Sequence, residues 1–515
     1  MSPPARPNLL ILMADQLAAA ALPAYGGTVA RAPHIGRLAR EGVVFDAAYC
    51  SSPLCAPSRY GMLTGRLPSR FGAFDNASEL PSEVPTFAHH LRLAGYRTVL
   101  SGKMHFAGPN QLHGFEERLT TDIYPADFAW TPDWRRPGVR PSWYHDMASV
   151  LEAGPCVRTN QLDFDDEVVF QARRKLHDLA RDGDARPFCL VVSMTHPHDP
   201  YAISAPHWAR YRDDEIDLPR LGASDVPDDP HSRRLRAACL IDATPLTTAQ
   251  VRRARHAYYG AISYVDDQVG VLLATLREID RADDTVVVLL SDHGDMLGER
   301  GLWYKMNFFE PAARVPLVFH APGRFAPGRV REAVALHDLL PTLVELAGAG
   351  APPADIDGRS LLAQLARHGG GRDEAACEYL GEGAVAPMAM LRRGRFKFIH
   401  CAADPDLLFD LEADPLELHD LAAAPAHAAL VAELRAEVAR RWPLQALHER
   451  VLASQDARRL VHAAESQGRR SAWDFEPRKD PSRQYVRSHM PLASIEAMSR
   501  YPAPPRADSS SAPTP

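Results

Sequence analysis

A cysteine stands in an unusual setting in the segment SSPLCAPSRYGMLTGR, residues 51–66. Cys55 comes two residues before a proline and four residues before an arginine, Arg59. A lone cysteine is most often a small buried hydrophobic residue, and that explanation stands as long as no other chemistry accompanies it. Whether Cys55 reacts therefore depends on which polar motifs elsewhere in the chain can be brought to it.

Carboxylates end or follow two apolar runs of the chain. Asp15 ends NLLILMAD, and Asp292 and His293 follow TVVVLLS. Asp15 by itself could equally be a helix N-cap. Two carboxylates with one imidazole favour a shared divalent-cation site, with Ca²⁺ preferred and Mn²⁺ or Mg²⁺ as alternatives. Gln16 could add an amide oxygen to such a site.

Five side chains that carry a positive charge or a proton form a second set. They are Lys103 and His105 in SGKMH, His196 and His198 in THPHDPY, and Lys305 in GLWYKMNFFE. Each alone is best explained as a surface residue or as a hydrogen-bonded histidine. Together they could hold a doubly charged oxyanion. Within the set, we assign His196 to the structure rather than to catalysis.

The elements that must position these residues alternate along the chain. Runs such as NLLILMAD, RTVLSGK, PFCLVVSMTH and DTVVVLLSDHGD predict strands, and the segments between them, including a long one at about residues 248–278, predict helices. Continuous apolar runs between helices are typical of a parallel sheet that is covered on both faces. Ligands of such sheets bind beyond the carboxyl ends of the strands. The candidates at those ends are Asp15, Lys103, His196, His198 and Asp292.

The expected fold class is therefore α/β, with a large, mostly parallel sheet sandwiched by helices over residues 1–370. After the glycine-rich segment ARHGGGRDEA (residues 366–375) the pattern changes. Two strands joined at Arg393–Gly394 and a helix at about residues 425–442 predict a smaller α+β subdomain with an antiparallel sheet over residues 371–445. Residues 446–515 are expected to form an extended tail whose final dozen residues are disordered.

Composition limits the classes of partner. The net charge of −7 argues against nucleic acid and anionic membranes as partners. No apolar run reaches the roughly 18 residues that a transmembrane helix needs, and the stretch Leu9–Ala14 is too short for a signal peptide. The 7 cysteines are scattered and odd in number, which argues against a disulfide framework. These features together predict a cytoplasmic protein.

The segment CAPSR followed by LTGR resembles the signature of the class I sulfatases of the alkaline phosphatase superfamily. Within that family, SGKMHFAGPNQLHGFEERLTTDIYPADFAWTPDW, THPHDPY, SDHGDMLGERGLWYKMNFFE and the C-terminal RSHM are similar to the choline-sulfatases. The resemblance extends over nearly the whole chain. It implies a mixed, sulfatase-like sheet and the hydrolysis of a small sulfate ester, choline sulfate. It also implies that a formylglycine-generating enzyme converts Cys55 to formylglycine.

The resemblance assigns a role to each polar candidate. The hydrated aldehyde at Cys55 would attack sulfur and would share one divalent cation with Asp15, Asp292 and His293. Deprotonation of its second hydroxyl would then release sulfate, whereas a plain serine would retain a stable ester. The remaining roles are sulfate and diol binding by Arg59 and Lys103, a further sulfate contact by Asn76, base catalysis of aldehyde release by His105, and protonation of the leaving oxygen by His198 and Lys305.

The choline end needs an aromatic face and an anion, because a quaternary ammonium donates no hydrogen bond. Trp130 and His145 match the places where the family frames this group, and Glu382 would supply the carboxylate. A core role for Trp130 is the alternative. One residue departs from the family pattern: Pro491 stands after RSHM, where an acidic residue is expected, so the affinity for choline would be weaker.

The aromatic residues of the tail suggest that it packs on a surface. Trp473, Phe475 and Tyr485 are interleaved with charges and prolines. In the family this segment reaches a neighbouring subunit, which implies a homo-oligomer, a dimer or a tetramer; folding back on its own chain is the alternative. Two rival functions stay open: a phosphonate monoester or phosphodiester hydrolase of the same superfamily, and a catalytically silent anion-binding protein.

Overall fold

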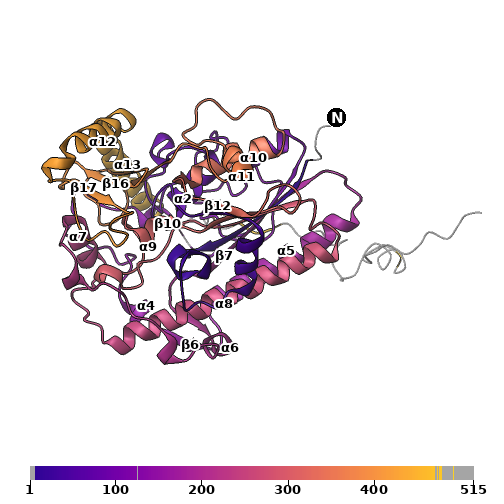
Figure 1. Ribbon diagram of the computed structural model, residues 1–515, viewed down its shortest axis with the longest axis horizontal. Helices are drawn as coiled ribbons and strands as arrows, with labels where there is room; N and C mark the ends of the chain where they lie inside the picture. Colours follow the sequence, from indigo (N-terminus) through magenta and orange to yellow (C-terminus); the bar gives the residue numbers. More distant parts are fainter. Residues whose placement is uncertain (1–5, 125, 470–472, 474, 478–490, 492–515) are drawn as a thin grey trace, which may run out of the picture.

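The computed structural model describes residues 6–124, 126–469, 473, 475–477 and 491. At its centre lies an eight-stranded sheet between layers of helices (Figure 1). Strand β11 is antiparallel to both of its neighbours, and the other pairings are parallel, which confirms the predicted mixed, mostly parallel sheet. In spatial order the strands are β12 (Gly328–Val330), β2 (Val43–Phe45), β11 (Leu317–His320), β9 (Thr285–Ser291), β1 (Asn8–Asp15), β7 (Phe188–Pro197), β4 (Arg97–Gly102) and β5 (Glu117–Arg118).

The middle strands have no exposed face. All eight residues of β1 are buried, and Leu10 pairs with Leu190 of β7 on one side and with Val287 of β9 on the other. Such continuous apolar strands require cover above and below the sheet. The two long helices α5 (Asn160–Arg181) and α8 (Thr248–Glu278) pack on each other and on β7. Helices α2 (Cys55–Thr64), α3 (Phe87–Leu93) and α10 (Leu339–Leu346) pack together on the opposite side (Figure 1).

Four neighbouring strands bring the candidate residues to one edge of the sheet. Strands β9, β1, β7 and β4 are adjacent and mutually parallel, so their carboxyl ends lie together. Asp15 is the last residue of β1, Lys103 directly follows β4, His198 directly follows β7 and Asp292 directly follows β9. The topology therefore confirms the sequence argument that these residues share an edge.

The C-terminal part contains a separate antiparallel sheet, as predicted. Its strands, in order, are β14 (Glu374–Tyr379), β15 (Met388–Arg393), β16 (Phe396–Cys401) and β17 (Leu407–Asp410). Helix α12 (Ala428–Arg441) packs on β15 and β16. Whether residues 371–445 form a domain of their own stays a prediction.

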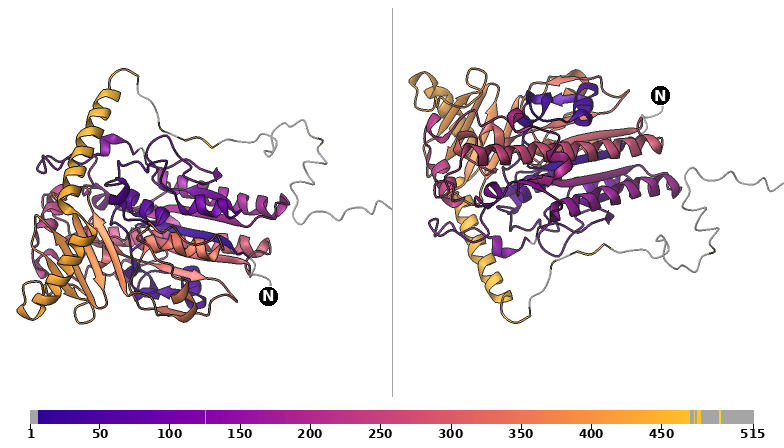
Figure 2. Two further views of the ribbon diagram at one scale, coloured as in Figure 1. Left: turned by 90° about the horizontal axis from the view of Figure 1, so that it is seen from above. Right: turned by 90° about the horizontal axis from the view of Figure 1, so that it is seen from below.

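The start of the expected tail is a helix that the sequence analysis did not anticipate. Helix α13 (Leu444–Glu465) has 22 residues, so an extended segment can begin only after it. Figure 2 shows this helix, in yellow, at the same end of the molecule as the small sheet. Val451 and Gln455 are buried against the rest of the chain, whereas Leu460 is 72 % exposed. Among the described helices, none combines the length and the apolar character needed to cross a bilayer.

Candidate active site

Cys55 opens helix α2 and is buried at the carboxyl edge of the sheet. Its side chain is 1 % exposed. Ser58 Oγ donates to the backbone oxygen of Asp292 at 2.6 Å, which attaches the first turn of α2 to the end of β9. Gly65 ends the helix in the left-handed region at φ 67°, a conformation that glycine adopts without strain. The CAPSR and LTGR segments are therefore the beginning and the end of one short helix.

Four buried side chains gather around Cys55 Sγ and could hold a metal ion: Asp15, Cys55, Asp292 and His293, whose potential ligand atoms all lie within 4.8 Å of one another. Cys55 Sγ is 3.2 Å from His293 Nε2 and 3.9 Å from Asp15 Oδ1. His293 Nε2 is 3.7 Å from Asp292 Oδ2. Two carboxylates and one imidazole, all buried, are a donor set that suits a divalent cation.

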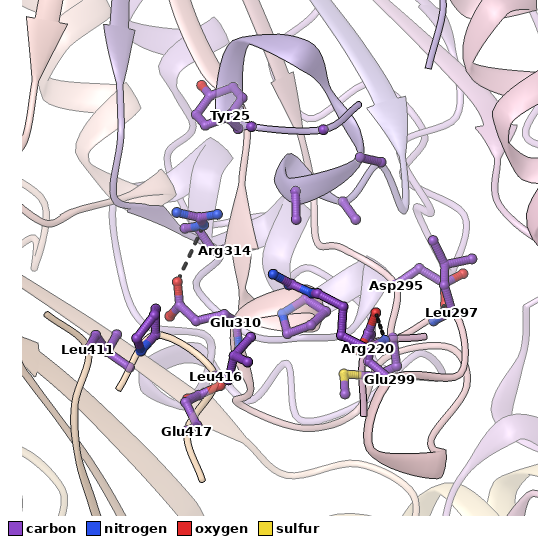
Figure 3. A pocket seen from close by; sticks show the side chains of 18 of the residues that line it. Tyr25, Arg220, Asp295, Leu297, Glu299, Glu310, Arg314, Leu411, Leu416 and Glu417 are labelled. Atoms are coloured by element: carbon purple, nitrogen blue, oxygen red, sulfur yellow. Dashed lines mark hydrogen bonds and ion pairs between the residues drawn. The ribbon is translucent and has the colours of Figure 1, made fainter. Parts of the chain in front are cut away.

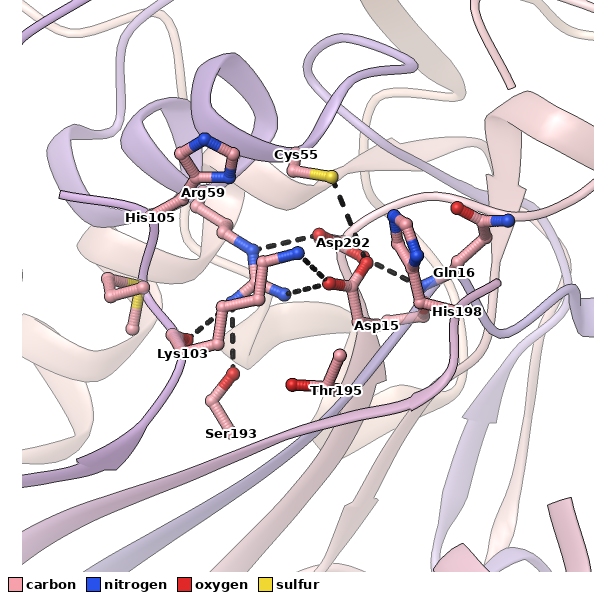
Figure 4. A network of polar contacts seen from close by, with 12 residues as sticks. Asp15, Gln16, Cys55, Arg59, Lys103, His105, Ser193, Thr195, His198 and Asp292 are labelled. Atoms are coloured by element: carbon pink, nitrogen blue, oxygen red, sulfur yellow. Dashed lines mark hydrogen bonds and ion pairs between the residues drawn. The ribbon is translucent and has the colours of Figure 1, made fainter. Parts of the chain in front are cut away.

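Arg59 connects the two carboxylates of this group (Figure 4). Its Nε donates to Asp292 Oδ2 at 2.8 Å, and its Nη2 lies 3.3 Å from Asp15 Oδ2. Lys103 Nζ also contacts Asp15 Oδ2. The Oδ1 atom of Asp15 is thereby left facing Cys55 and His293. Asp15 thus contacts the cations Arg59 and Lys103 through Oδ2 and faces the candidate metal group through Oδ1.

The structure directs Gln16 away from the role of an extra metal ligand. Its amide oxygen accepts a hydrogen bond from Lys305 Nζ at 2.6 Å, and its Nε2 donates to Asp295 Oδ2 at 2.6 Å. Lys305 Nζ lies 2.6 Å from His198 Nε2 as well. Since His198 Nδ1 lies 2.6 Å from the backbone oxygen of Asp199 and donates to it, Nε2 is left to accept from Lys305. Gln16 therefore orients Lys305 rather than completing the metal group.

Two other predicted residues lie beside Cys55 and keep polar atoms available. Both ring nitrogens of His105 are buried and have no hydrogen-bond partner in the described part of the chain. Asn76 Oδ1 accepts from the backbone N–H of Ala56 at 3.0 Å, in the first turn of α2. Its amide is therefore held beside Cys55. By contrast, His196 Nδ1 pairs with Asp165 Oδ2 at 2.6 Å, and this pairing supports a structural role.

The cluster creates a field that favours negative charge at position 55. Burial alone would raise the pKa of the Cys55 thiol, but Lys103, Lys305 and His293 lower that pKa well below its usual value. Burial and Cys55 likewise act to raise the pKa of Asp15, and Lys103, His198 and Arg59 overcome them, so this pKa is lowered. The arrangement can therefore stabilise an oxyanion next to the side chain of residue 55.

Aromatic rings lie next to His105 and His198: the Trp130 ring is 6.1 Å from that of His105, and the His145 ring is 6.0 Å from that of His198. Trp130, in the short helix η4 (Phe128–Trp130), stacks on Trp143 with ring centroids 6.1 Å apart and planes 4° apart. His145 stacks on Tyr304 at 4.6 Å. Burial lowers the pKa of His145 to about 4, despite the opposing effect of Asp199. The imidazole of His145 is consequently neutral at neutral pH.

Glu382 supplies a buried carboxylate in the same region. Its side chain is 5 % exposed, and Oε2 has no hydrogen-bond partner among the described residues. Burial and, to a smaller extent, Asp75 raise its pKa, Lys305 opposes them, and the resulting pKa is about 7. Tyr379 Oη donates to the backbone oxygen of Glu382, which holds the turn. A buried, unpaired carboxylate is costly unless a ligand of opposite charge completes it.

The first described residues of the tail lie on their own chain. Trp473 packs edge-on against Phe128 at 5.1 Å, and Phe475 lies over the guanidinium of Arg118 at 5.6 Å. This contact agrees with the alternative in which the arm folds back. Tyr485 lies outside the described residues, and Pro491 is exposed. How the rest of the tail lies stays a prediction.

The sequence analysis missed several polar and aromatic residues of the site. Tyr124 Oη lies 3.1 Å from His198 Nδ1, and its ring lies 4.2 Å from Lys103 Nζ. Asp199 Oδ2 accepts from Ser149 Oγ at 3.0 Å, and Asp199 Oδ1 lies 3.1 Å from His198 Nδ1. Asp199 stands inside THPHDPY, so that motif contained the signal. Trp143 had no such signal, because its stacking on Trp130 depends on the loop conformation.

A separate cavity of about 610 Å³ is lined by residues of helix α8, of the loop that follows His293 and of the segment that follows β17 (Figure 3). Its lining mixes charges that pair with one another: Arg314 Nε lies 3.3 Å from Glu310 Oε2, and Glu299 accepts from the backbone of Arg220. Cys55 and the metal group do not line it. It reaches the site only through Asp295, the acceptor of the Gln16 amide. The candidate chemistry therefore lies elsewhere, at the strand ends.

Comparison with known proteins finds matches over most of the chain. Residues 7–349 match the family model described as Sulfatase, and residues 449–501 match the model described as Choline sulfatase enzyme C terminal. The chain is 47 % identical over 508 residues to the choline-sulfatase of Rhizobium meliloti, covering 96 % of this chain and 99 % of the relative. It is 27 % identical to an arylsulfatase of Clostridium perfringens, covering 81 % of this chain and 90 % of the relative.

The fold is shared with solved hydrolases. The phosphonate monoester hydrolase of Agrobacterium radiobacter superposes with a TM-score of 0.68 at 24 % identity, covering 86 % of this chain and 96 % of that one. At this identity the likeness concerns the fold alone. The family match over two thirds of the chain, together with the extended similarity to a choline-sulfatase, shows that the chain belongs to the sulfatase family.

Proposed function

We propose that the protein hydrolyses choline sulfate to choline and sulfate. The observation that carries the proposal is the pairing of two half-sites: an oxyanion site built around Cys55, and a buried carboxylate with aromatic rings beside it. An ester of sulfate and a quaternary ammonium alcohol carries both matching charges. The similarity to the choline-sulfatase of Rhizobium meliloti over nearly the whole chain supports the same substrate.

The residues around Cys55 fit a divalent cation and a formylglycine. Asp15, Asp292 and His293 would hold the cation together with the side chain derived from Cys55, and we favour Ca²⁺ because oxygen ligands predominate. When present, the hydrated aldehyde and the cation supply a nucleophilic hydroxyl for sulfur and a second hydroxyl whose deprotonation releases sulfate. The cationic field that lowers the pKa of the Cys55 thiol would favour the deprotonated form of that hydroxyl too.

The chain's own residues divide the remaining work. Lys103 and Arg59 orient Asp15, and with the Asn76 amide they would bind the sulfate oxygens. Both ring nitrogens of His105 are unpaired among the described residues. His105 would therefore accept the proton of the second hydroxyl when sulfate is released. Lys305 Nζ lies 2.6 Å from His198 Nε2 and donates to it, so the pair would protonate the choline oxygen as the ester bond breaks: Lys305 carries the proton at this contact, and His198 holds Lys305 in place.

The cationic end of the substrate would lie between rings and carboxylate. Trp130 and neutral His145 offer faces that attract an ammonium group, and Glu382 offers the counter-charge. None of these groups requires a hydrogen-bond donor from the ligand. Such a site favours choline sulfate over an aryl or sugar sulfate, because only choline sulfate carries a quaternary ammonium group.

We further propose that the protein is cytoplasmic, is matured by a formylglycine-generating enzyme and forms a homo-oligomer. All seven cysteines are free thiols, which suits a reducing compartment. The apolar side chains of Leu460 and Val461 are exposed on α13, and such a face is typical of a subunit contact. Trp473 and Phe475 pack on their own chain, and the part of the tail beyond Pro477 would complete the mouth of a neighbouring site.

The test is an assay of the purified enzyme on choline sulfate, an aryl sulfate and a phosphonate monoester, with the mass of the Cys55 peptide read in parallel. We expect kcat/KM to be highest for choline sulfate and the peptide to carry formylglycine. Full activity in protein with wholly unmodified Cys55 would contradict the proposed chemistry. A preference for the phosphonate would favour the rival hydrolase, and inactivity of fully converted, metal-loaded protein on all three would favour an anion-binding protein.

A further inference from the structure

Helix α13 carries a buried arginine, Arg458, which pairs with Asp75, the residue before Asn76. Arg458 Nη1 donates to Asp75 Oδ1 at 2.6 Å, and Nη2 donates to Asp75 Oδ2 at 2.7 Å. The side chain of Arg458 is 9 % exposed and that of Asp75 is fully buried. A bidentate pair of this kind has a defined geometry, unlike a surface ion pair. Its partners are 383 residues apart in the sequence.

Asp75 controls the turn that carries Asn76. Its Oδ1 accepts from the backbone N–H of Ala77 at 3.0 Å and from Ser78 Oγ at 3.2 Å. Asn76 Oδ1 in turn accepts from the backbone N–H of Ala56, beside Cys55. The Nδ2 group of Asn76 makes no hydrogen bond with any described residue. It is therefore the group of this turn that is left for a ligand anion.

The charge of Asp75 would oppose the ligand if it were not compensated. A buried carboxylate next to an anion-binding amide repels a sulfate ester. Asp75 also raises the pKa of Glu382, so its influence reaches across the site. The guanidinium of Arg458 is the partner that meets both oxygens of this carboxylate. Without it, the turn would present a net negative charge to the substrate's sulfate.

The same helix reaches the cationic side. Gln455 Oε1 accepts from the backbone N–H of Trp134 at 3.0 Å, and Trp134 Nε1 donates to the backbone oxygen of Gly381 at 3.1 Å, next to Glu382. Helix α13 also packs on the short helix that carries Trp130. Most of α13 falls within the part of the chain that matches the choline sulfatase C-terminal model. One helix thus supports both ends of the candidate site.

We propose that Arg458 is a positioning residue for sulfate: it neutralises Asp75 and orients the 75–78 turn so that Asn76 presents its amide to the anion. The inference rests on the proposed sulfate ester hydrolysis but not on choline as the alcohol. It assigns a function in sulfate binding to a helix at the start of the C-terminal segment.

The test compares R458M, R458K, D75N and the double variant R458M/D75N in the converted, metal-loaded enzyme. The readouts are KM and kcat for choline sulfate and for an aryl sulfate, and the inhibition constants of inorganic sulfate and of choline. For R458M we expect the KM of both esters and the inhibition constant of sulfate to rise about tenfold, with kcat and choline inhibition much less affected. R458K keeps the charge and should lie between R458M and the wild type.

The double variant separates charge from packing. The amide oxygen that D75N introduces can still accept from Ala77 and Ser78, so the turn keeps its internal hydrogen bonds without the charge. R458M/D75N should therefore return the sulfate inhibition constant to within about threefold of the wild type. D75N alone should leave that constant unchanged or lower, so it tests the idea even if R458M does not fold. The matched control is R459M, since the neighbouring Arg459 pairs with Asp133, which keeps its second partner Arg136.

The inference is overturned if R458M leaves sulfate inhibition unchanged, if the double variant is no better than R458M, if D75N weakens sulfate binding tenfold, or if R459M behaves like R458M. These outcomes are independent of the proposed substrate. A wild-type enzyme that ignores choline sulfate but cleaves the aryl sulfate would contradict the proposed function and still report on Arg458.

Discussion

Glu382→Gln removes a buried negative charge that no described residue pairs with. The change keeps the size of the side chain and removes its negative charge. The unpaired oxygen Oε2 becomes either the amide nitrogen or the neutral carbonyl oxygen of glutamine. Both residues that most affect Glu382 through charge, Asp75 and Lys305, stay in place. The substitution therefore isolates the attraction between carboxylate and quaternary ammonium.

Its magnitude follows from the charge and the burial. The methyl groups of choline keep nitrogen and carboxylate about 5 Å apart, and at an effective dielectric constant of about 20 this attraction is worth about 3 kcal/mol. Since part of this is offset by the loss of ligand hydration, we expect the KM for choline sulfate to rise between about tenfold and a hundredfold. An aryl sulfate, whose alcohol part carries no positive charge, should show no such loss.

The raised pKa adds a pH signature. The pKa of Glu382 is about 7 in the folded protein, so the group is protonated below that pH and loses its attraction for the cation. In the wild type, the ratio of kcat/KM for choline sulfate to that for the aryl sulfate should fall as the pH drops below about 7. In Glu382→Gln this ratio should be independent of pH above about pH 5, where His145, with a pKa of about 4, stays neutral.

The substitution should weaken binding of choline sulfate but stabilise the folded protein at high pH. A carboxyl group whose pKa rises from 4.5 to about 7 on folding binds its proton more tightly in the native state. Its stabilising contribution is full below pH 4.5 and is lost as the pH rises through 7, which amounts to about 3 kcal/mol at most. Glu382→Gln should therefore raise the melting temperature at pH 8 while it weakens the binding of choline sulfate.

The matched control is Glu378→Gln. Glu378 is buried in β14 and its pKa is raised to about 7 by burial, but its oxygens accept from Ser69 and Trp442. This variant should keep the KM of choline sulfate. The reasoning is refuted if Glu382→Gln raises the KM of both substrates equally, if the pH dependence of the ratio persists in it, or if Glu378→Gln gives the same loss.

Three further predictions concern the rings, the metal group and the tail. Trp130→Ala should cost about 0.5–2 kcal/mol of binding for choline sulfate and spare an aryl sulfate; an equal loss on both substrates would mean that Trp130 supports the fold. Asp292→Ala removes a carboxylate from the metal group and a partner from Arg59, so metal content and turnover should fall together, and full turnover of chelator-stripped protein would refute the assignment. Ending the chain after Gly468 should lower the mass measured by light scattering and raise KM more than it lowers kcat; unchanged mass and KM would show that the tail has neither role.

The sequence by itself determined the large-scale plan and the grouping of the candidate residues. Apolar runs such as NLLILMAD are long enough and continuous enough to require a covered parallel strand. Polar residues directly after such runs must meet at the carboxyl edge, so Asp15, Lys103, His198 and Asp292 could be grouped without coordinates. These are local properties, because a strand's end is set by its own residues.

The tertiary structure decided which partner each of these side chains takes. Gln16 follows Asp15 directly, yet its amide bonds to Lys305 and Asp295 because the segment after β9 packs against it. Helix α13 has a weak apolar pattern, and its Arg458 meets Asp75 across almost the whole chain. Such pairings depend on packing between segments that are remote in sequence, and no spacing or motif encodes them. The order of the strands brought the candidate residues to one edge, and the packing of α13 and of segments remote in sequence decided their partners.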